Sequence, residues 1–233
     1  VKGNTRVNTK IVELSQGITT DFNENGVAVD EENYEELKRR VLKYARRSEF
    51  MVFSGSIPKG LNTTVYKELM NIVKDEKKIE LDADGKLLME GIKSSPFIIK
   101  PNVFELENAF VIKLNTDKDI VNIARYISDK YQIKWVLVSL GEKGSLLVSD
   151  KKVLRAEPVK VTVKSTVGAG DSMLGEFTYA LSEKFGEKLA LAYATACGTV
   201  AVTKEGTQAS TAKEIDEMLN KIEVIDVSSE YAH

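Results

Sequence analysis

Short apolar segments alternate with amphipathic helical patterns along most of the chain, and this alternation limits its fold more than any other feature. Strands are predicted at residues 50–53, 79–82, 97–99, 135–139 and 144–148. Helices are predicted at residues 30–47, 62–77, 117–130, 169–185, 187–203 and 211–222. Continuous apolar strands separated by helices are typical of a mostly parallel sheet that helices cover on both faces. We therefore predict a three-layer α/β/α fold.

The first 29 residues follow a different pattern. Val7, Thr9 and Ile11 alternate with Asn8 and Lys10, which indicates a strand with two unlike faces. Gly17 and the Asn-Gly pair at 25–26 are turn signals, so we expect a hairpin-rich element here. We accordingly divide the chain into residues 1–29, part of a small β unit, and residues 30–233, one α/β domain.

The charge and cysteine content exclude several classes of protein. The 233 residues include 33 Lys and Arg and 35 Asp and Glu, a net charge of −2, with both signs interspersed. We therefore expect no nucleic-acid partner. No apolar stretch has the length of a membrane span, so we expect no membrane partner either. Cys197, the only cysteine, lies in an apolar run, which excludes a disulfide framework and predicts a protein of the reducing cytoplasm.

Residues 165–173 join a small flexible turn to an apolar helix. Gly168 and Gly170, with only Ala169 between them, allow several backbone N–H groups to point at one anion. The helix that follows favours negative charge at its N-terminus, and Asp171 lies in its first turn. Two interpretations stay open for Asp171 at this point. It either complements the helix dipole or acts as a base beside an anion site.

Further polar or glycine-rich segments follow three of the predicted strands, at residues 54–56, 100–102 and 139–144. In a parallel sheet, ligands bind beyond the carboxyl ends of the strands. We therefore expect these segments to lie near residues 168–171 and to form one site with them.

The motif inventory favours phosphoryl transfer over other chemistry. A dinucleotide-binding loop would need a glycine three residues after Gly170, but Met173 stands there, and no Gly-x-x-x-x-Gly-Lys loop is present. His233 is the only histidine, which disfavours a histidine base or a histidine-rich metal site. Phosphoryl transfer needs a positioned phosphate and a carboxylate that accepts a hydroxyl proton, and Asp171 beside the glycine turn suits both needs.

Taken together, the motifs resemble the ribokinase-like sugar kinases, in the branch that phosphorylates sugar phosphates. They span essentially the whole chain, as Lys2-Gly3-x-Thr5-Arg6-x-Asn8, Ser54-Gly55-Ser56-x-Pro58-x-Gly60, Lys100-Pro101-Asn102-x-x-Glu105, Ser139-Leu140-Gly141-x-x-Gly144 and Thr166-Val167-Gly168-Ala169-Gly170-Asp171-Ser172. The chain looks most like the fructose-1-phosphate kinases, and the tagatose-6-phosphate kinases come next. The resemblance implies ATP-dependent conversion of fructose 1-phosphate to fructose 1,6-bisphosphate, or the same reaction on another ketose phosphate.

The resemblance also implies roles for residues around the transferred phosphate. Asp171 would take the proton from the acceptor hydroxyl, and the glycine turn Gly168, Ala169 and Gly170 would hold the phosphate. Asn102 and Glu105 would organise a magnesium and phosphate network, with Glu105 acting through water, an arrangement that Mg²⁺ accepts because it retains several waters.

The substrates would bind on either side of this centre. On the sugar side, the resemblance implies Arg6, Asn8, Ser54, Gly55 and Asp171, and the Arg6 guanidinium is suited to the phosphate already on the sugar. On the nucleotide side, it implies Lys100, Asn102, Ser139, Gly141, Gly144, Thr166, Gly168 and Gly170.

The family's pattern begins before this sequence does. Its opening strand and an aspartate that grips sugar hydroxyls lie upstream of the motif that starts at Lys2, so we interpret Val1 as a position inside a longer protein. We expect residues 1–233 alone to bind nucleotide but to transfer phosphate poorly. The β unit corresponds to a lid in this family, and such lids often pair between subunits, which suggests a homodimer.

A function of another class remains an alternative. A regulatory protein that binds a nucleotide or a sugar phosphate without catalysis would have the same fold. The intact set of Asp171, Asn102 and Glu105 argues against that alternative.

Overall fold

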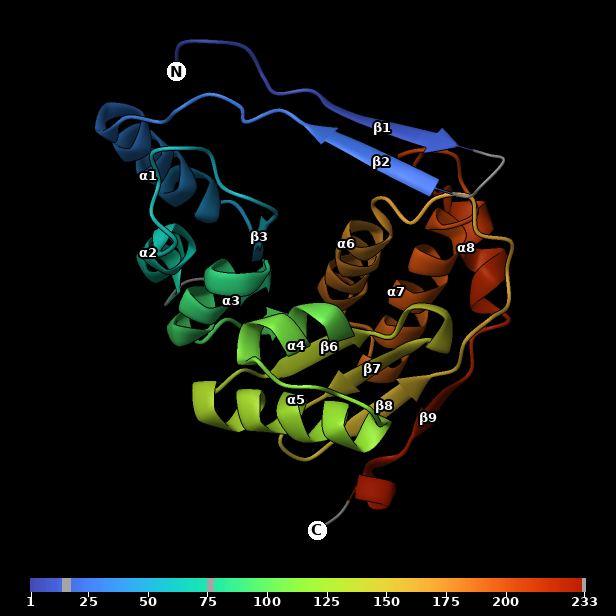
Figure 1. The fold of residues 1–233 in the computed structure, drawn as a ribbon. Helices are drawn as coiled ribbons and strands as arrows, with labels where there is room; N and C mark the ends of the chain where they lie inside the picture. Colours follow the sequence, from blue (N-terminus) through green and yellow to red (C-terminus); the bar gives the residue numbers. More distant parts are fainter. Residues whose placement is uncertain (14–17, 75–77, 232–233) are drawn as a thin grey trace.

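The computed structural model describes residues 1–13, 18–74 and 78–231, which form a seven-stranded sheet, a separate two-stranded sheet and the helices around them (Figure 1). The large sheet contains β3 (Phe50–Ser54), β4 (Lys78–Asp82), β5 (Ile98–Ile99), β6 (Trp135–Ser139), β7 (Ser145–Val148), β8 (Val153–Ala156) and β9 (Val224–Asp226), in that spatial order. Strands β3 to β6 pair in parallel, and β6 to β9 pair antiparallel. Therefore β3, β4, β5, β6 and β8 run in one direction, and the predicted mostly parallel sheet is confirmed.

Helices cover both faces of this sheet, as predicted (Figure 1). One face packs on α1 (Glu31–Ala45), α2 (Val65–Val73), α3 (Gly85–Gly91), α4 (Val103–Phe110) and α5 (Asp117–Tyr131). The other packs on α6 (Ala169–Ser182) and α7 (Glu187–Ala201), beside which lies α8 (Ala212–Leu219). Strand β6 shows why two layers form, because Val136 and Val138 enter one core and Trp135 and Leu137 enter the other. None of the helices in the described ranges has the length and apolarity needed to cross a membrane.

Several elements differ from the sequence prediction. Helices α3 and α4 and strands β8 and β9 were not predicted, since each is too short to show a clear apolar period. Helix α2 begins at Val65, three residues later than expected, and its predicted end at residue 77 lies outside the described residues. Asn102, predicted to follow a strand and to face the nucleotide and the magnesium ion, is also the N-cap of α4, a role that was not predicted.

The two-stranded sheet is the predicted hairpin. Strands β1 (Asn8–Glu13) and β2 (Ile18–Asn23) pair antiparallel, and the residues between them, 14–17, lie outside the described part. The hairpin lies apart from the main sheet, across the open end between α1 and α8 (Figure 1). The register places Ile11, Ile18 and Phe22 on one face, where each is 50% exposed or more. The division of the chain after residue 29 agrees with this separation and remains a prediction.

Candidate active site

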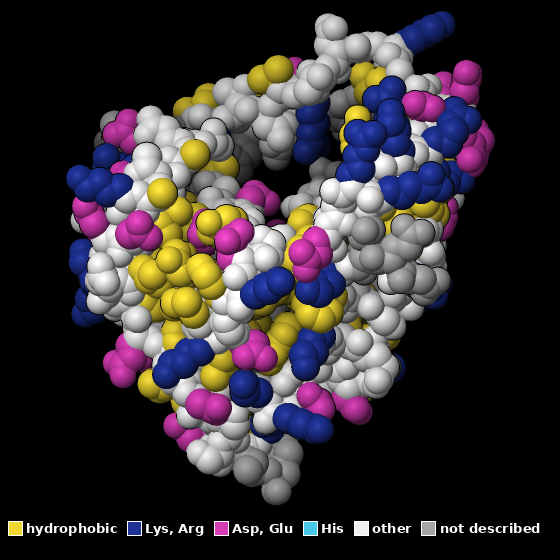
Figure 2. Space-filling view, turned by 180° about the vertical axis from the view of Figure 1, so that it is seen from behind, with side chains coloured by type: hydrophobic (Ala, Val, Ile, Leu, Met, Phe, Trp, Pro, Cys, Tyr) yellow, Lys and Arg dark blue, Asp and Glu magenta, His cyan; other side chains and the backbone are white. Residues whose placement is uncertain are grey.

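A cleft of about 1040 Å³ opens at the carboxyl ends of the parallel strands. Its walls bring together most of the residues that the sequence predicts for the nucleotide and the phosphate: Lys100, Asn102, Glu105, Ser139, Gly141, Gly144, Thr166, Ala169, Gly170 and Asp171. Figure 2 shows the molecule hollowed beneath the hairpin at this end, with acidic and basic side chains around the opening. The segments at 100–102 and 139–144 therefore meet residues 169–171 at this edge of the sheet.

Helix α6 begins in the cleft and presents the glycine turn and Asp171 there. Gly168 is its N-cap and has a φ of 74°, a left-handed conformation that favours glycine. Among the described residues, the amides of Gly170 and Asp171 have no hydrogen-bond acceptor, as is usual in the first turn of a helix. The Asp171 carboxylate accepts a hydrogen bond from Ser54 Oγ at 3.4 Å. A carboxylate thus lies beside two free N–H donors.

Lys100 brings a buried positive charge to the same point. Its side chain is 5% exposed, and Nζ lies 3.1 Å from Asp82 Oδ1 at the end of β4. A Cβ atom on Gly170 would lie only 3.0 Å from Lys100 Nζ, so the ammonium group approaches the glycine turn directly. Burial raises the pKa of Asp82, and Lys100 opposes that shift. Asp82 was missed in the sequence analysis, although an acid at the carboxyl end of a buried strand is a usable signal.

Asn102 and Glu105 form a reciprocal capping box at the start of α4. The Asn102 side chain accepts from the Glu105 amide at 2.8 Å, and Glu105 Oε2 accepts from the Asn102 amide at 2.8 Å. Both residues also line the cleft, and Asn102 lies beside Ser139 in a parallel bridge. Burial raises the pKa of Glu105. The pair therefore has a structural role as well as a position from which it faces a ligand.

The glycine-rich turn after β6 forms another wall of the cleft. Gly144 has a φ of 87°, and a Cβ atom there would lie 2.2 Å from the carbonyl oxygen of Ala156. Arg155 of β8 donates to the Lys143 carbonyl at 3.3 Å and forms ion pairs with Asp117 at 2.5 Å and Glu157 at 2.9 Å. Arg155 was missed because it belongs to a strand that the sequence pattern did not predict.

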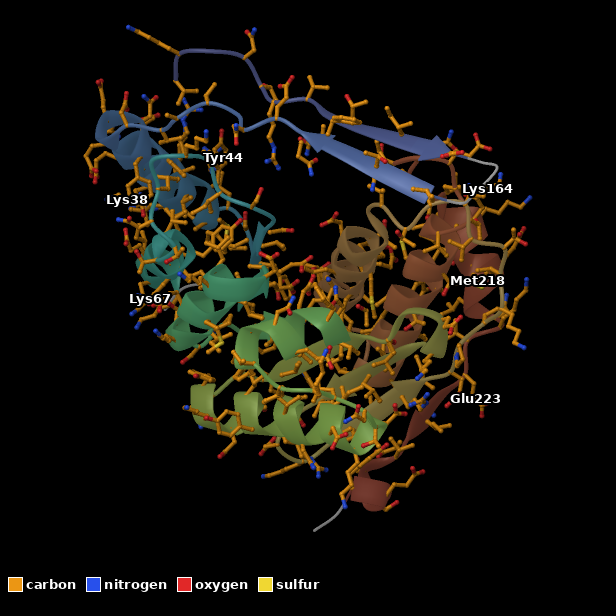
Figure 3. All side chains as sticks on the ribbon, viewed as in Figure 1. Lys38, Tyr44, Lys67, Lys164, Met218 and Glu223 are labelled. Carbon is orange, nitrogen blue, oxygen red and sulfur yellow. The ribbon has the colours of Figure 1, made fainter. Side chains whose placement is uncertain are left out.

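Among the described residues predicted for the sugar, Asp171 lines this cleft, Ser54 reaches it through Asp171, and Arg6, Asn8 and Gly55 are not part of its lining. Ser54 and Gly55 follow β3, and the Tyr66 hydroxyl reaches their carbonyl oxygens at 2.7 and 3.0 Å. The Arg6 guanidinium donates to Ser56 Oγ at 3.0 Å, which connects the hairpin segment to this loop. Asn8 lies at the exposed start of β1. Figure 3 shows side chains of the hairpin that point down toward the opening between β3 and α6.

Comparison with known proteins gives consistent results. The sequence pattern of the pfkB family carbohydrate kinases matches residues 1–214. The chain is 30% identical over 228 residues to a 1-phosphofructokinase of Borreliella burgdorferi, covering 97% of this chain and 72% of that protein. It is also 30% identical over 230 residues to a tagatose-6-phosphate kinase of Staphylococcus epidermidis, covering 97% and 74%.

The fold also resembles a solved structure. A crystal structure of phosphofructokinase-2 from Escherichia coli in complex with potassium superposes with a TM-score of 0.84 and 27% identity, covering 92% of this chain and 70% of that one. The two chains therefore share the α/β/α architecture.

Proposed function

Because the chain belongs to the pfkB family of carbohydrate kinases, we propose that it transfers the terminal phosphoryl group of ATP to a hydroxyl group of a ketose phosphate. Fructose 1-phosphate is the first candidate, with fructose 1,6-bisphosphate as the product, and the likeness to 1-phosphofructokinases supports this choice. The observation that carries the proposal is the position of Asp171, beside two free amides of α6 and close to the buried cation Lys100.

In this mechanism, Asp171 accepts the proton of the sugar hydroxyl while the hydroxyl oxygen attacks the terminal phosphorus atom. The bond between that phosphorus and the bridging oxygen of ATP breaks, and ADP leaves. The turn of Gly168, Ala169 and Gly170, with its free N–H groups, and the Lys100 ammonium group stabilise the negative charge of the group in transfer. Ser139, Gly141, Gly144 and Thr166 hold the rest of the nucleotide in the cleft.

A magnesium ion fits the residues at this site. No cluster of three or more His, Cys, Asp or Glu side chains suited to a metal occurs in the described ranges. Asn102 and Glu105 offer oxygen donors on the wall of the cleft, and so few donors suit Mg²⁺ bound mainly by water and phosphate oxygens, which is how this ion commonly binds nucleotides in proteins. Glu105 and Asn102 would hold it from the wall of the cleft, Glu105 through water. When bound, the ion neutralises phosphate charge.

Arg6 is placed to recognise the phosphate that the sugar already carries. Its guanidinium group reaches the 54–56 loop, where Ser54 in turn contacts Asp171. A sugar bound between this loop and the hairpin would contact Arg6, Asn8, Ser54 and Gly55, with its acceptor hydroxyl at Asp171. Tagatose 6-phosphate is the alternative acceptor, which the likeness to a tagatose-6-phosphate kinase supports.

We place the protein in the cytoplasm and the hairpin in a homodimer. Cys197 is buried and unpaired, in agreement with a reducing compartment. The hairpin, as a lid over the sugar, exposes Ile11, Ile18 and Phe22 on one face. An apolar face of this kind is typical of an interaction surface, and a second copy of the lid would cover it.

The variant Asp171→Asn tests the catalytic assignment. It keeps the shape of the side chain but removes its ability to accept a proton, so turnover should fall by at least about 10²-fold. Nucleotide affinity, measured by calorimetry, should stay within a few-fold of the unaltered protein. Exposed Asp216→Asn on α8 is the matched control and should leave both quantities unchanged. Full turnover in Asp171→Asn would remove Asp171 from the mechanism.

A further inference from the structure

Glu80 occupies an unusual place for a carboxyl group. It lies in the middle of β4 with no exposed surface, between Val52 of β3 and Ile98 of β5 in the parallel register. Ile98 belongs to the apolar core beneath α6 and α7. An ionised carboxylate in such surroundings is strongly unfavourable unless it is paired. A neutral carboxylic acid is the form that this environment favours.

The hydrogen bonds of Glu80 support the neutral form independently. Its Oε2 lies 2.5 Å from Thr178 Oγ1 on α6, and the same hydroxyl lies 2.8 Å from the Leu174 carbonyl oxygen. A hydroxyl has one proton, and a carbonyl oxygen only accepts. Both short contacts are satisfied together when Glu80 donates to Thr178 and Thr178 donates to Leu174. Glu80 Oε1 has no partner among the described residues, which is less unfavourable for an uncharged C=O than for a carboxylate.

The ionisable side chains on the neighbouring elements are not placed to stabilise a negative charge on Glu80. Strands β3 and β5 carry no ionisable side chain. On α6, Asp171 contacts Ser54, Glu176 faces Asp216, and Tyr179 is exposed. On β4, Lys78 pairs with Glu49, and Asp82 pairs with Lys100. Burial accordingly raises the pKa of Glu80 to about 7, and a hydrogen bond that Thr178 would donate to the ionised carboxylate opposes this shift only in part.

Thr178 connects this acid to the site. It follows Asp171 by two helical turns on the same side of α6, so the contact with Glu80 fixes the helix that carries the base. We propose that Glu80 is a positioning residue for phosphoryl transfer, whose protonated carboxyl group holds α6 against β4 through Thr178 and thereby sets the place of Asp171. This inference rests on the proposed function of Asp171.

The consequence is a dependence of catalysis on pH. Below the pKa of Glu80 the proton is present and α6 is held; above it the proton passes to solvent, and the buried carboxylate favours displacement of α6 or entry of water. Displacing a reacting group by about 1 Å costs up to about 10²-fold in rate. We expect kcat to fall roughly tenfold as pH rises from about 6 to about 8.5, while the KM for ATP stays within about twofold.

Three variants separate this role from simple packing. Glu80→Gln keeps the shape and, as an amide, donates to Thr178 at every pH, so its kcat should lack the alkaline fall. Thr178→Val removes the hydroxyl and should lower kcat even at about pH 6, whereas Thr178→Ser should restore it. Phosphate groups of the substrates also titrate near pH 6. We therefore compare the kcat of wild type with the kcat of Glu80→Gln, as a ratio, at each pH. Glu217→Gln, exposed on α8, is the control and should follow wild type.

Hydrogen exchange gives a readout that does not need activity. The hydrogen-bonded amides at 172–174 should exchange faster at about pH 8 than at about pH 6, after correction for intrinsic rates, in wild type but not in Glu80→Gln. Equal pH dependence of exchange and of kcat in wild type and Glu80→Gln would overturn the proposal. If the protein transfers no phosphate to any ketose phosphate, the proposed function fails, and the exchange data alone then decide whether Glu80 holds α6.

Discussion

At the scale of single residues, the pair of Lys100 and Asp82 shows how the cleft depends on charge compensation. Removal of one partner leaves a buried charge alone, which costs about 3–5 kcal/mol. We therefore expect Lys100→Met to lower the free energy of unfolding by about that amount, measured by urea denaturation near neutral pH. The double variant with Asp82→Asn should recover part of the loss.

The surface ion pair of Lys113 with Glu107 supplies the matched control. Lys113 is 81% exposed, and an exposed pair contributes only about 0–1 kcal/mol. Lys113→Met should therefore change stability little. If Lys100→Met and Lys113→Met had equal effects, the buried pair would not be the source of stability that the geometry indicates.

The sequence indicated many of the site residues because they belong to short motifs at strand ends and at the start of a helix. Asp171, Lys100 and Asn102 were found in this way. Glu80 and Arg155 were not, since their importance depends on partners from other elements, Thr178 on α6 and Asp117 on α5. Long-range pairs of this kind leave no local pattern in a single sequence.

At the scale of elements, the turn between β6 and β7 requires a glycine at position 144. Gly144→Ala would place a Cβ atom 2.2 Å from the Ala156 carbonyl oxygen at a φ of 87°. We expect this variant to lose at least about 1–3 kcal/mol of stability and to bind nucleotide more weakly, measured by denaturation and calorimetry.

Gly175→Ala is the control for this prediction. Gly175 lies in the middle of α6 and is exposed, with nothing within 4 Å of a new Cβ atom. Alanine favours helix over glycine, so this variant should gain about 0.5–1 kcal/mol. A loss in Gly175→Ala as large as in Gly144→Ala would contradict the steric explanation.

Long periodic elements were predicted well, and short ones were not. Helices α1, α5, α6 and α7 each have 14 or 15 residues and a clear apolar stripe or run. In contrast, β9 has three residues and α3 has seven, and tertiary packing rather than local pattern stabilises them. The antiparallel pairing of β8 and β9 likewise depends on contacts between residues far apart in the sequence.

At the scale of the whole molecule, the proposed lid dimer can be tested at the hairpin. If the face with Ile11, Ile18 and Phe22 pairs with a second copy, Phe22→Lys should convert a dimer into a monomer, because a buried charge would oppose association. Light scattering or sedimentation measures this change. Val111→Lys, at a position that is 90% exposed and away from the hairpin, should leave the assembly unaltered. A monomer at all concentrations without any substitution would exclude the lid dimer.

The central claim is that this protein phosphorylates a ketose phosphate with ATP and that Asp171 is the base. The most direct test follows the products by phosphorus NMR in the protein at its natural length, with ATP, magnesium and, in turn, fructose 1-phosphate, tagatose 6-phosphate and fructose 6-phosphate. We predict that fructose 1-phosphate gives ADP and fructose 1,6-bisphosphate most rapidly and that Asp171→Asn stops the reaction. Nucleotide binding without phosphate transfer to any of the three sugars would contradict the account and favour a regulatory protein.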